Sequence, residues 1–531
     1  MIACKKMRKY CLFPIVLILT LIPCVLPAQG ISPETNSLSS QLDTLIKYQR
    51  VVCKEMGKSG LWSIIWVLSL IPCISFAQGV SPETNILSSQ LDTLIKYQLP
   101  AGSNVSVSAY DLTANKVLYD YQADKLSRPA STMKLLTTIT ALARPEADEP
   151  FRTEVWYKGV IERDTLKGDI YVVGGFDPEF DDEALDSLVG SVARLPFSVV
   201  QGRIYGDVSM KDSLYWGSGW LWDDTPHSFQ PYLSPLMLDK GVVTVTAFPG
   251  AQGDAARLEC TPASSYYTLA NTTKTRTPSA GRFRVSRNWL ENGNELAVSG
   301  NVDGRRTGTV NIYSSQDFFM HTFLERLRAK GIHCLSDYSF REFQKDSVSV
   351  RMASYSTSVQ TVVNRIMKES DNLNAEALLC RLGTQFTGGR HVSAADGLSA
   401  VRQLIGKLGY LPDRYNLADG CGLSNYNYIS SELLVAFLKF AYSRTDVFQK
   451  LYKALPIGGV DGTLKNRMRK GTPSYKNVHA KTGSFTAINC LAGYLKANNG
   501  HHIAFAIMNQ NVLSGREARK FQDAVCDMLI R

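Results

Sequence analysis

The sequence predicts an α/β protein in which a mixed helix-and-strand domain is interrupted by a β-rich insertion. Helix and strand patterns alternate in residues 78–150 and again in 351–531, whereas residues 151–350 carry short apolar runs broken by Gly, Asn and Asp turns. Three short polar motifs lie in the outer segments, with their first residues at 131, 370 and 481. If these motifs line one cleft, the ends of the middle segment must return to neighbouring points, which makes the outer domain discontinuous.

Composition places the chain among globular proteins of two to four domains. It has 531 residues, of which 44% are hydrophobic, 20% charged and 10% aromatic, so disordered and fibrous classes are excluded. The net charge is +10, but residues 1–77 hold eight Lys or Arg against three Asp or Glu and so account for half of it. The remaining excess is too small to predict a nucleic-acid partner.

The first hundred residues contain a tandem repeat, because residues 29–49 recur almost unchanged as residues 78–98. Each copy has a basic start, an apolar run and an Ala-Gln step, which is the anatomy of a secretory signal peptide. We therefore expect residues 1–77 to be a duplicated signal-peptide region and the protein to be exported. The alternative of membrane anchors is disfavoured, since both apolar runs are shorter than the roughly 20 residues of a spanning helix.

The second copy of the leader has the better cleavage site. Ser75 and Ala77 supply small residues at both required positions, while the first copy does not. Met56 is then a candidate second start of translation and Gln78 the expected mature N-terminus.

The sequence predicts no metal ion and no cofactor. Six cysteines follow the leader at separations too wide for a metal site, although an exported protein could pair some of them: Cys260, Cys334, Cys380, Cys421, Cys490 and Cys526. The only closely spaced histidines among seven are His501 and His502, which as strand neighbours would point to opposite faces.

The outer domain begins with two strands and a helix. Alternating residues at 104–109 and 116–121 predict strands joined by a turn, and a helix-prone apolar run extends through Leu142 to Pro145. Ser131 stands near the start of this helix, so Lys134 lies one turn along on the same face. The lysine amine can then reach the serine hydroxyl.

Helical patterns return after the β-rich segment. They cover residues 359–367, 374–383, 394–408 and 430–442. The chain closes with strands around Lys481 and at 502–508 and an amphipathic helix over 516–530.

The three motifs are Ser131-Thr-Met-Lys134, Ser370-Asp-Asn372 and Lys481-Thr-Gly483. A Ser-x-x-Lys occurs by chance about once or twice in such a chain, and each of the others on the order of 0.1 times, so their ordered conjunction indicates serine acyl transfer without a histidine. Taken singly, each has a plain structural alternative: the first two cap helices, and the third leads into a strand. No Gly-x-Ser-x-Gly elbow supports a Ser-His-Asp triad instead.

The chemistry assigns a role to each of the first two motifs. Ser131 is the expected nucleophile and needs a base within about 3 Å. Lys134 can be that base only as a neutral amine, which requires that burial and a second cation, Lys481, lower its ordinary pKa of about 10.4. Ser370 would relay a proton to the leaving group, and Asn372 would bind the substrate amide or orient Lys134.

The third motif is expected to hold the substrate. Lys481 and Thr482 would bind a substrate carboxylate, and Gly483 would let the substrate backbone approach closely. The backbone N–H groups of Ser131 and Ser484 would stabilise the oxyanion.

From about Ile86 to its end, the chain resembles the low-molecular-mass class C (type-4) penicillin-binding proteins, which are D-alanyl-D-alanine carboxypeptidases and endopeptidases. Besides the three motifs, the resemblance rests on strings that begin at Pro129, Asp177, Ser370, Asp419 and Gly459. It implies a serine transpeptidase/β-lactamase-like domain, with an antiparallel sheet flanked by helices, made from residues 78–150 and 351–531. It also implies an inserted domain over 151–350 that itself carries a third near 245–300.

The resemblance further implies a periplasmic enzyme that forms an acyl-enzyme on Ser131. Its substrates would be peptidoglycan stem peptides, with peripheral contact with the cell wall, and β-lactams would inhibit it. Relatives that recognise a diaminopimelate side chain use an acidic and an aromatic residue, which Asp224 and Phe229 resemble. The structural alternative for these two residues is a turn aspartate and a core phenylalanine. Relatives often have an arginine at the position of Asn425 and a serine at Cys421, so an amidated or otherwise altered stem peptide is a plausible substrate.

Two alternatives stay open at this stage. A β-lactamase or esterase of the same fold would share the motifs but need a group that activates water for deacylation, and the sequence offers no candidate. A non-enzymatic wall-binding protein would be expected to carry degraded motifs, whereas all three are intact.

Overall fold

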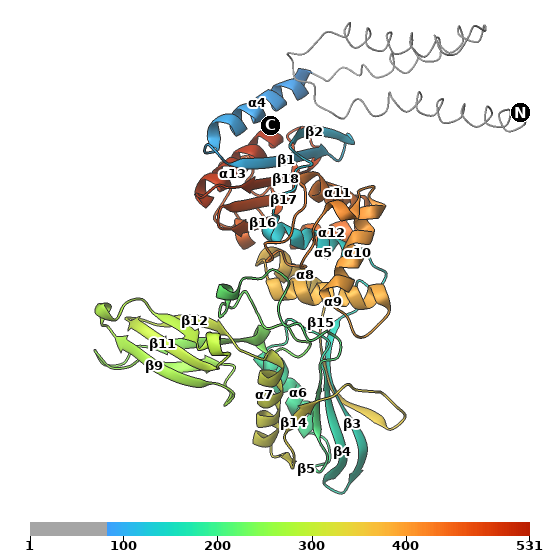
Figure 1. Ribbon diagram of the computed structural model, residues 1–531, viewed down its shortest axis with the longest axis vertical. Helices are drawn as coiled ribbons and strands as arrows, with labels where there is room; N and C mark the ends of the chain where they lie inside the picture. Colours follow the sequence, from blue (N-terminus) through green and yellow to red (C-terminus); the bar gives the residue numbers. More distant parts are fainter. Residues whose placement is uncertain (1–81) are drawn as a thin grey trace, which may run out of the picture. The chain divides into compact units, whose positions relative to one another are not determined.

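The computed structural model describes residues 82–531 (Figure 1). The duplicated signal-peptide region, the second start and the expected N-terminus at Gln78 lie outside the described residues. The first element is helix α4, Pro82–Gln98.

A five-stranded antiparallel sheet joins the two ends of the described chain. Its order is β16-β17-β18-β1-β2, so the blue strands of Figure 1 lie beside the red ones. The central pairing sets Val107 opposite Ile507. The strands predicted at 104–109, 116–121, around Lys481 and at 502–508 are thereby confirmed. The bounds are β1 Asn104–Asp111, β2 Lys116–Tyr121, β16 His479–Phe485, β17 Ile488–Lys496 and β18 His502–Gln510.

Both faces of this sheet are buried, which explains the nearly continuous apolar runs of β17 and β18. One face packs against α13 and α4 through residues such as Phe505 and Phe521. The other face packs against a helical layer through Ala492 and Ala506, with α11 lying directly on the sheet. The turn Ala130–Thr132, which leads into α5 (Met133–Leu142) of this second core, contacts the sheet edge at β16.

The helical layer contains five of the six predicted helices and one more, while the helix predicted at 516–530 is α13 on the opposite face of the sheet. The predictions near 131–142, 359–367, 374–383, 394–408, 430–442 and 516–530 are confirmed. The sequence prediction missed α12, a short amphipathic helix that packs on α8 and α11. The bounds are α5 Met133–Leu142, α8 Val359–Lys368, α9 Asn372–Thr387, α10 Ala394–Lys407, α11 Ser431–Ser443, α12 Thr445–Ala454 and α13 Gly515–Ile530.

The segment between α5 and α8 forms a seven-stranded sheet and two three-stranded sheets. The seven-stranded sheet is mixed, since β3, β4 and β15 pair antiparallel and β6 pairs parallel to β4 and β14. Its bounds are β3 Phe151–Glu162, β4 Thr165–Val173, β5 Val199–Val200, β6 Ile204–Asp207, β13 His333–Cys334, β14 Tyr338–Phe340 and β15 Ser349–Thr357.

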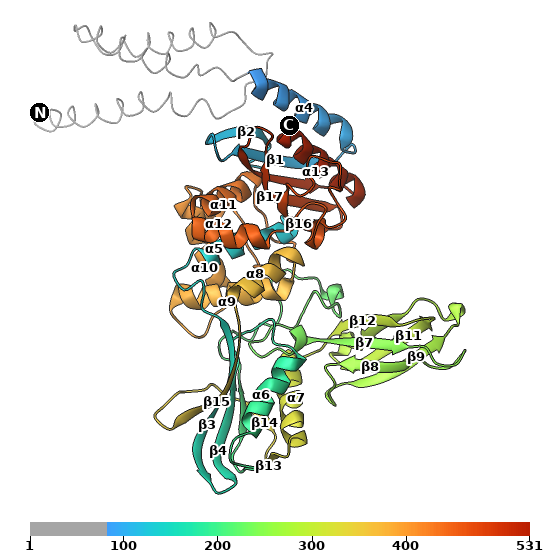
Figure 2. The ribbon, with the colours of Figure 1, turned by 180° about the vertical axis from the view of Figure 1, so that it is seen from behind.

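The two smaller sheets have the orders β12-β7-β8 and β10-β11-β9 (Figure 2). In β7 and β11, buried residues alternate with more accessible ones, so one face of each of these strands lies against the core. The bounds are β7 Val242–Phe248, β8 Arg257–Thr261, β9 Thr268–Thr275, β10 Arg284–Arg287, β11 Glu295–Val302 and β12 Arg306–Asn311.

The β-rich segment 151–350 also contains two helices, which the sequence did not predict. They are α6, Asp182–Ala193, and α7, Ser315–Ala329, which pack together against the seven-stranded sheet. Asp181 caps α6 by accepting a hydrogen bond from the N–H of Ala184 at 2.9 Å.

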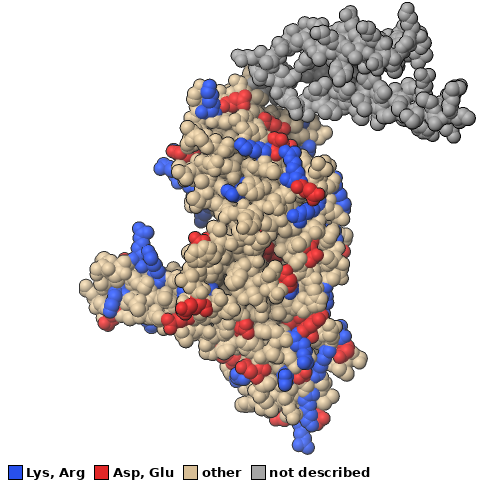
Figure 3. Space-filling model, viewed as in Figure 1, with Lys and Arg blue, Asp and Glu red and all other residues tan. Residues whose placement is uncertain are grey.

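Within residues 82–531 no helix is both long and apolar enough to span a membrane. The face drawn in Figure 3 carries basic and acidic side chains interspersed rather than one large patch of a single sign.

The six cysteines of the described chain are all free thiols. His501 precedes β18 and binds Asp111, with 2.7 Å between Nδ1 and Oδ2, so the idea that both neighbouring histidines lie on one strand was wrong.

Candidate active site

Ser131 lies in a tight 3₁₀ turn, η3 (Ala130–Thr132), that runs directly into α5. Its hydroxyl caps no helix, so the capping alternative does not account for it. Ala130 has a φ of +46°, a conformation that non-glycine residues rarely adopt. Strain of this kind is typical of functional turns, where the surrounding packing maintains it.

Lys134 is fully buried and reaches three acceptors with its amine. Its Nζ lies 3.0 Å from Ser131 Oγ, 2.7 Å from Asn372 Oδ1 and 2.6 Å from the carbonyl oxygen of Cys421. Burial lowers the pKa of Lys134, against the opposing effect of nearby acidic groups such as Cys421 and Asp419. A neutral amine in this position can accept the Ser131 proton.

The second motif joins α8 to α9. Ser370 has a φ of +63°, and its Oγ accepts a hydrogen bond from Lys481 Nζ at 2.8 Å. Asp371 caps α9, since its Oδ1 accepts from the N–H of Asn374 at 2.9 Å. The second motif therefore caps α9, as the sequence suggested, and also contacts both lysines.

Lys481 lies on β16 and is fully buried. Burial first, and the nearby Lys134 ammonium second, lower the pKa of Lys481 well below its ordinary value. Thr482 Oγ1 is 2.8 Å from Thr463 Oγ1, and Ser484 Oγ donates to Asn489 Oδ1 at 3.3 Å.

Gly483 is required by the nucleophile turn. A Cβ atom at this position would lie 2.7 Å from the carbonyl oxygen of Pro129 and 2.8 Å from the N atom of Ser131. This requirement is additional to the close approach of a substrate backbone that the sequence predicts. Gly422 also contacts this turn, since a Cβ atom added at Gly422 would lie 2.0 Å from the carbonyl oxygen of Ala130.

Phe229 comes to the second motif, whereas Asp224 does not line the same pocket. The carbonyl oxygen of Phe229 accepts from Asn372 Nδ2 at 2.8 Å, and its ring, 45% exposed, stacks on His227. Phe229 also lines a pocket of about 310 Å³ with Ser370, Asn372 and Lys240. Asp224 ends the short turn Trp222–Asp224, where partial burial and the neighbouring Asp223 raise its pKa.

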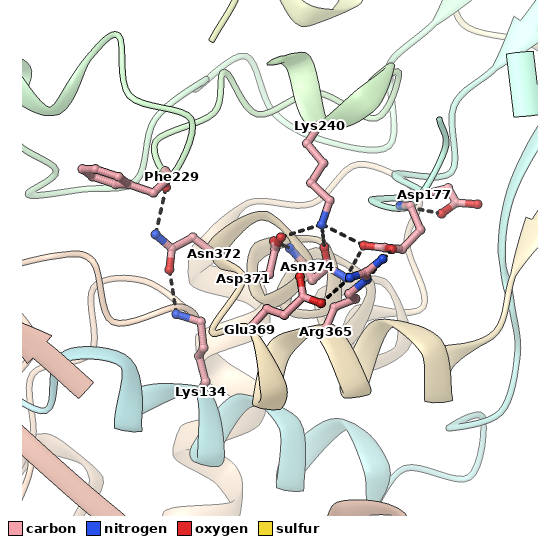
Figure 4. A network of polar contacts seen from close by, with 10 residues as sticks. Lys134, Asp177, Phe229, Lys240, Arg365, Glu369, Asp371, Asn372 and Asn374 are labelled. Carbon is pink, nitrogen blue, oxygen red and sulfur yellow. Dashed lines mark hydrogen bonds and ion pairs between the residues drawn. The ribbon is translucent and has the colours of Figure 1, made fainter. Parts of the chain in front are cut away.

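Sequence reasoning missed Lys240, which reaches the second motif from the middle segment (Figure 4). Its Nζ lies 2.5 Å from Asp371 Oδ2, 3.1 Å from Asn374 Oδ1 and 2.8 Å from Glu179 Oε1. Glu179 also binds Arg365 of α8. Lys240 has a left-handed backbone conformation, with φ of +62°. Nothing in the sequence around it indicates that conformation or its contact with the second motif.

Sequence reasoning also missed Glu376, which supports the loop beneath Lys134. Glu376 Oε1 accepts from the N–H groups of Gly420 and Cys421, and Asp419 accepts from three donors that fold the same loop. Burial and the Asp419 carboxylate raise the pKa of Glu376 to about 7. These two carboxylates and the Cys421 thiol lie close together, but their hydrogen bonds to the loop account for the cluster without a metal. The Ser370 string, Ser-Asp-Asn-Leu-Asn-Ala-Glu, contains Glu376 and is the only pointer to it.

The departure at Asn425 also has a structural context. The carbonyl oxygen of Asn425 accepts a hydrogen bond from Arg128 Nε at 3.1 Å, and the Arg128 guanidinium stacks over the ring of Tyr428. An arginine therefore stands beside position 425, three residues before Ser131.

Curated relatives resemble the chain in sequence over most of its length. The chain is 29% identical over 440 residues to a D-alanyl-D-alanine carboxypeptidase of Actinomadura sp., covering 80% of each protein. It is 25% identical over 413 residues to the D-alanyl-D-alanine carboxypeptidase DacB of Haemophilus influenzae, covering 77% of this chain and 85% of that one.

The fold matches crystal structures of penicillin-binding protein 4 from Haemophilus influenzae. One superposes with a TM-score of 0.71 at 23% identity and covers 83% of this chain and 99% of that chain. Another, with a TM-score of 0.68, holds a β-lactam. The predicted α/β fold class and the family resemblance are confirmed. The sequence profile of the D-Ala-D-Ala carboxypeptidase 3 (S13) family matches residues 87–531, and the chain belongs to that family of serine peptidases.

Proposed function

We propose that the chain is a serine-type D-Ala-D-Ala carboxypeptidase and D,D-endopeptidase that acts on peptidoglycan stem peptides through an acyl-enzyme on Ser131. The observation that carries the proposal is the buried Lys134 amine 3.0 Å from Ser131 Oγ, and within residues 82–531 no histidine is hydrogen-bonded to either atom. Burial favours the neutral amine, and a neutral amine is what a serine nucleophile requires.

Acylation follows from these contacts. Ser131 Oγ attacks the carbonyl carbon of the penultimate D-Ala as Lys134 takes the hydroxyl proton. The C–N bond then breaks, and the departing amine of the terminal D-Ala takes a proton through Ser370, which accepts a hydrogen bond from Lys481. Attack of water on the acyl-enzyme releases the shortened peptide and restores Ser131.

Substrate binding is assigned to the third motif and to the loop that reaches Asn372. Lys481 and Thr482 bind the terminal carboxylate, and the N–H groups of Ser131 and Ser484 stabilise the oxyanion. Gly483 allows the strand and the nucleophile turn to touch, which keeps these N–H groups close together.

Recognition of the stem-peptide side chain is assigned to Phe229 and Asp224. The contact between the Phe229 carbonyl and Asn372, and the position of the Phe229 ring at the pocket, support a role for Phe229. Asn425 in place of an arginine supports an amidated or otherwise altered stem peptide.

The domain division is also part of the proposal. Residues 78–150 and 351–531 form the catalytic domain, and residues 151–350 are the insertion that carries a third domain near 245–300. Support comes from the five-stranded sheet, which takes strands from both ends of the described chain, and from the two smaller sheets within the insertion.

Export to the periplasm through the duplicated signal-peptide region, with peripheral contact with the cell wall, completes the proposal. Its support is the leader anatomy of residues 1–77 together with membership in a carboxypeptidase family. β-Lactams are expected to acylate Ser131, in line with the β-lactam complex of the Haemophilus influenzae protein.

The test supplies the protein with a D-Ala-D-Ala pentapeptide, with a D,D-cross-linked peptide dimer and with labelled penicillin. We expect release of D-Ala, cleavage of the dimer and a persistent penicilloyl adduct, all lost in Ser131→Ala and retained in the surface control Ser187→Ala. Rapid hydrolysis of penicillin would indicate a β-lactamase instead, and absence of any turnover or adduct would indicate a wall-binding protein.

A further inference from the structure

A second pocket, of about 380 Å³, lies outside the three catalytic motifs. It is bounded by the segment that follows β6, by α9 and α10, and by the loop between α10 and α11. None of the residues of the three motifs lines it. It is nevertheless close to the nucleophile, because Glu376 of its lining binds the amide N–H of Cys421 at 2.8 Å and the carbonyl of Cys421 binds Lys134 at 2.6 Å.

The lining combines an exposed apolar rim with a few polar groups. Leu214, Trp216 and Tyr426 are 67%, 40% and 57% exposed, which is unusual for large apolar side chains. Ser393 and Asn416 add hydrogen-bonding groups. Pockets of a few hundred Å³ with apolar walls and a small number of convergent polar groups are the usual form of small-molecule sites.

Arg402 is the cation of this pocket that lacks an acidic partner. Its Nη2 donates to the carbonyl oxygen of Leu417 at 3.3 Å, and no carboxylate of residues 82–531 pairs with it within 4.0 Å. Lys211, the other cation of the lining, is already paired with Asp212 at 2.6 Å. An unpaired guanidinium at an apolar pocket favours a ligand with a carboxylate, which arginine can bind through two parallel hydrogen bonds.

The rim is held in place by packing. Trp216 makes an edge-to-face contact with Tyr232, with ring centroids 5.0 Å apart. Gly219, at φ +75°, brings its loop against Tyr426 so closely that a Cβ atom would lie 2.5 Å from the ring. The pocket is therefore largely formed before a ligand arrives, which lowers the entropy cost of binding.

We propose that this pocket binds the sugar end of the peptidoglycan repeat: a hexosamine ring together with a free carboxylate of a stem-peptide residue near the sugar. The C–H face of a sugar ring packs on Trp216 and Tyr426, its hydroxyl and acetamido groups meet Ser393 and Asn416, and the carboxylate binds Arg402.

This proposal rests on the proposed function, because it assigns the part of that substrate that the catalytic cleft leaves unbound. A stem peptide of four or five residues spans at most about 15–18 Å from the reacting bond to its sugar. The pocket adjoins the loop that contacts Lys134, so the sugar of a bound substrate is within reach of it.

The test measures calorimetric binding to protein whose nucleophile is blocked, either by penicillin or by Ser131→Ala. The probes are a disaccharide-tetrapeptide from peptidoglycan and the same tetrapeptide without sugar. We expect the disaccharide-tetrapeptide to bind at least tenfold more tightly than the bare peptide, and Trp216→Ala and Arg402→Met each to weaken its binding about tenfold. Trp222→Ala is the matched control, since Trp222 is 70% exposed on the same segment but does not line the pocket.

Three results would overturn the proposal: equal affinity for the two probes, no effect of Trp216→Ala, or an equal loss in Trp222→Ala. Equal affinity would make the pocket a peptide site. Penicillin acylation of each variant reports that the catalytic domain is folded. Because acylation is measured separately, its failure would refute the proposed function, while failure of sugar binding would refute the pocket assignment alone.

Discussion

Two buried lysine amines, Lys134 and Lys481, are the central feature at the scale of the residue. Each is fully buried, and the pKa of each is lowered chiefly by that burial. Each amine also contacts the hydroxyl of a serine, Ser131 in one case and Ser370 in the other. Burial thus makes the neutral amine easier to reach at both positions than it is for an exposed lysine.

Lys134→Arg should abolish acylation while leaving the fold intact. Arginine keeps a donor near Asn372 but holds its proton at any accessible pH, so it cannot accept the proton of Ser131. We expect penicillin acylation to slow by about 10³-fold or more, within the range of general-base catalysis. Stopped-flow acylation of the variant measures this, with the exposed Lys125→Arg as control, and a variant that reacts within tenfold of the parent would exclude Lys134 as the base.

At low pH, the acylation rate should be limited by protonation of the Lys134 amine. Acylation requires unprotonated Lys134, so the rate rises as pH increases through the pKa of this group. Because burial lowers that pKa below 10.5, half-maximal acylation is expected at a pH below the ordinary value of lysine. A pH profile of the acylation rate measures it, and a limb at or above pH 10.5 would contradict the account.

Glu376 should make stability depend on pH. Its pKa is about 7 in the folded protein against an ordinary value of 4.5, so the folded state binds more protons between these values. The free energy of unfolding therefore falls as pH rises from 4.5 to 7, by at most about 3 kcal/mol. Thermal unfolding at pH 5 and pH 8 should differ less in Glu376→Gln than in the parent.

The exposed Glu259→Gln is the control for this measurement and should keep the parental pH dependence. An unchanged pH dependence in Glu376→Gln would show that other groups cause it.

The sequence predicted the motif residues because serine, lysine and asparagine rarely occur by chance at these spacings and in this order. Cys421 and Lys240 could not be predicted as partners. Cys421 acts through its backbone carbonyl, which any residue would supply, and Lys240 comes from 131 positions before its partner Asp371. Contacts of this kind depend on tertiary packing, which leaves no periodicity or spacing in the sequence.

At the scale of elements, the middle segment holds the start of α9. Lys240 binds Asp371, and the carbonyl of Phe229 binds Asn372, so two residues of the second motif have partners from that segment. Asp371 also raises the pKa of Lys134, and the Lys240 ammonium compensates part of its charge. The middle segment is therefore part of the environment that sets the pKa of Lys134.

Lys240→Met should slow acylation about tenfold and move its acid limb to higher pH. Without the ammonium, the carboxylates of Asp371 and Glu179 lose their partner and stabilise protonated Lys134 more strongly. The double variant Lys240→Met/Asp371→Asn should recover part of the shift. A merely structural role for Lys240 would lower stability without moving the acid limb.

The ion pair of Lys158 with Asp346, also in the middle segment, provides the control. Lys158→Met removes a pair at a strand edge away from the motifs and should leave the pH profile of acylation unchanged.

Helices of the outer domain were predicted more completely than those of the insertion. The missed helix α6 has apolar residues at 184, 185, 188, 189 and 192, which is helical spacing, and an aspartate cap. The helix was missed because the short apolar runs and turns on both sides of it led to the whole segment being interpreted as β-rich. The missed helix α7 is less amphipathic, with Asp317, His321 and Glu325 along its length, so its apolar face emerges only from packing on α6.

At the scale of the whole molecule, the five-stranded sheet depends on both ends of the described chain. Strand β18 stands between β17 and β1, so residues 400 positions apart in sequence are hydrogen-bonded neighbours. Phe151 and Thr357 are likewise opposite each other in the register of β3 and β15, which brings the two ends of the proposed insertion close together in space. The unequal spacing of the three motifs led to the same expectation.

The two small sheets should be removable without loss of the nucleophile. Val242 and Asn311 face each other in the register of β7 and β12, so the ends of this unit are adjacent. Replacing residues 244–309 with a short glycine linker should leave penicillin acylation within about threefold of the parent. Thermal stability should fall, because Val245 and Leu296 belong to the core shared with α7.

Loss of acylation in a folded deletion variant would contradict this separation of roles. Circular dichroism identifies whether the variant is folded, and the intact protein is the reference.

The central claim is that Ser131, activated by Lys134, forms the acyl-enzyme. The most direct measurement is mass spectrometry of peptides from protein treated with penicillin at neutral pH. The account predicts one penicilloyl group, on the peptide that contains Ser131, and none in Ser131→Ala. An adduct on Ser370 or another serine, or an adduct that survives in Ser131→Ala, would contradict it.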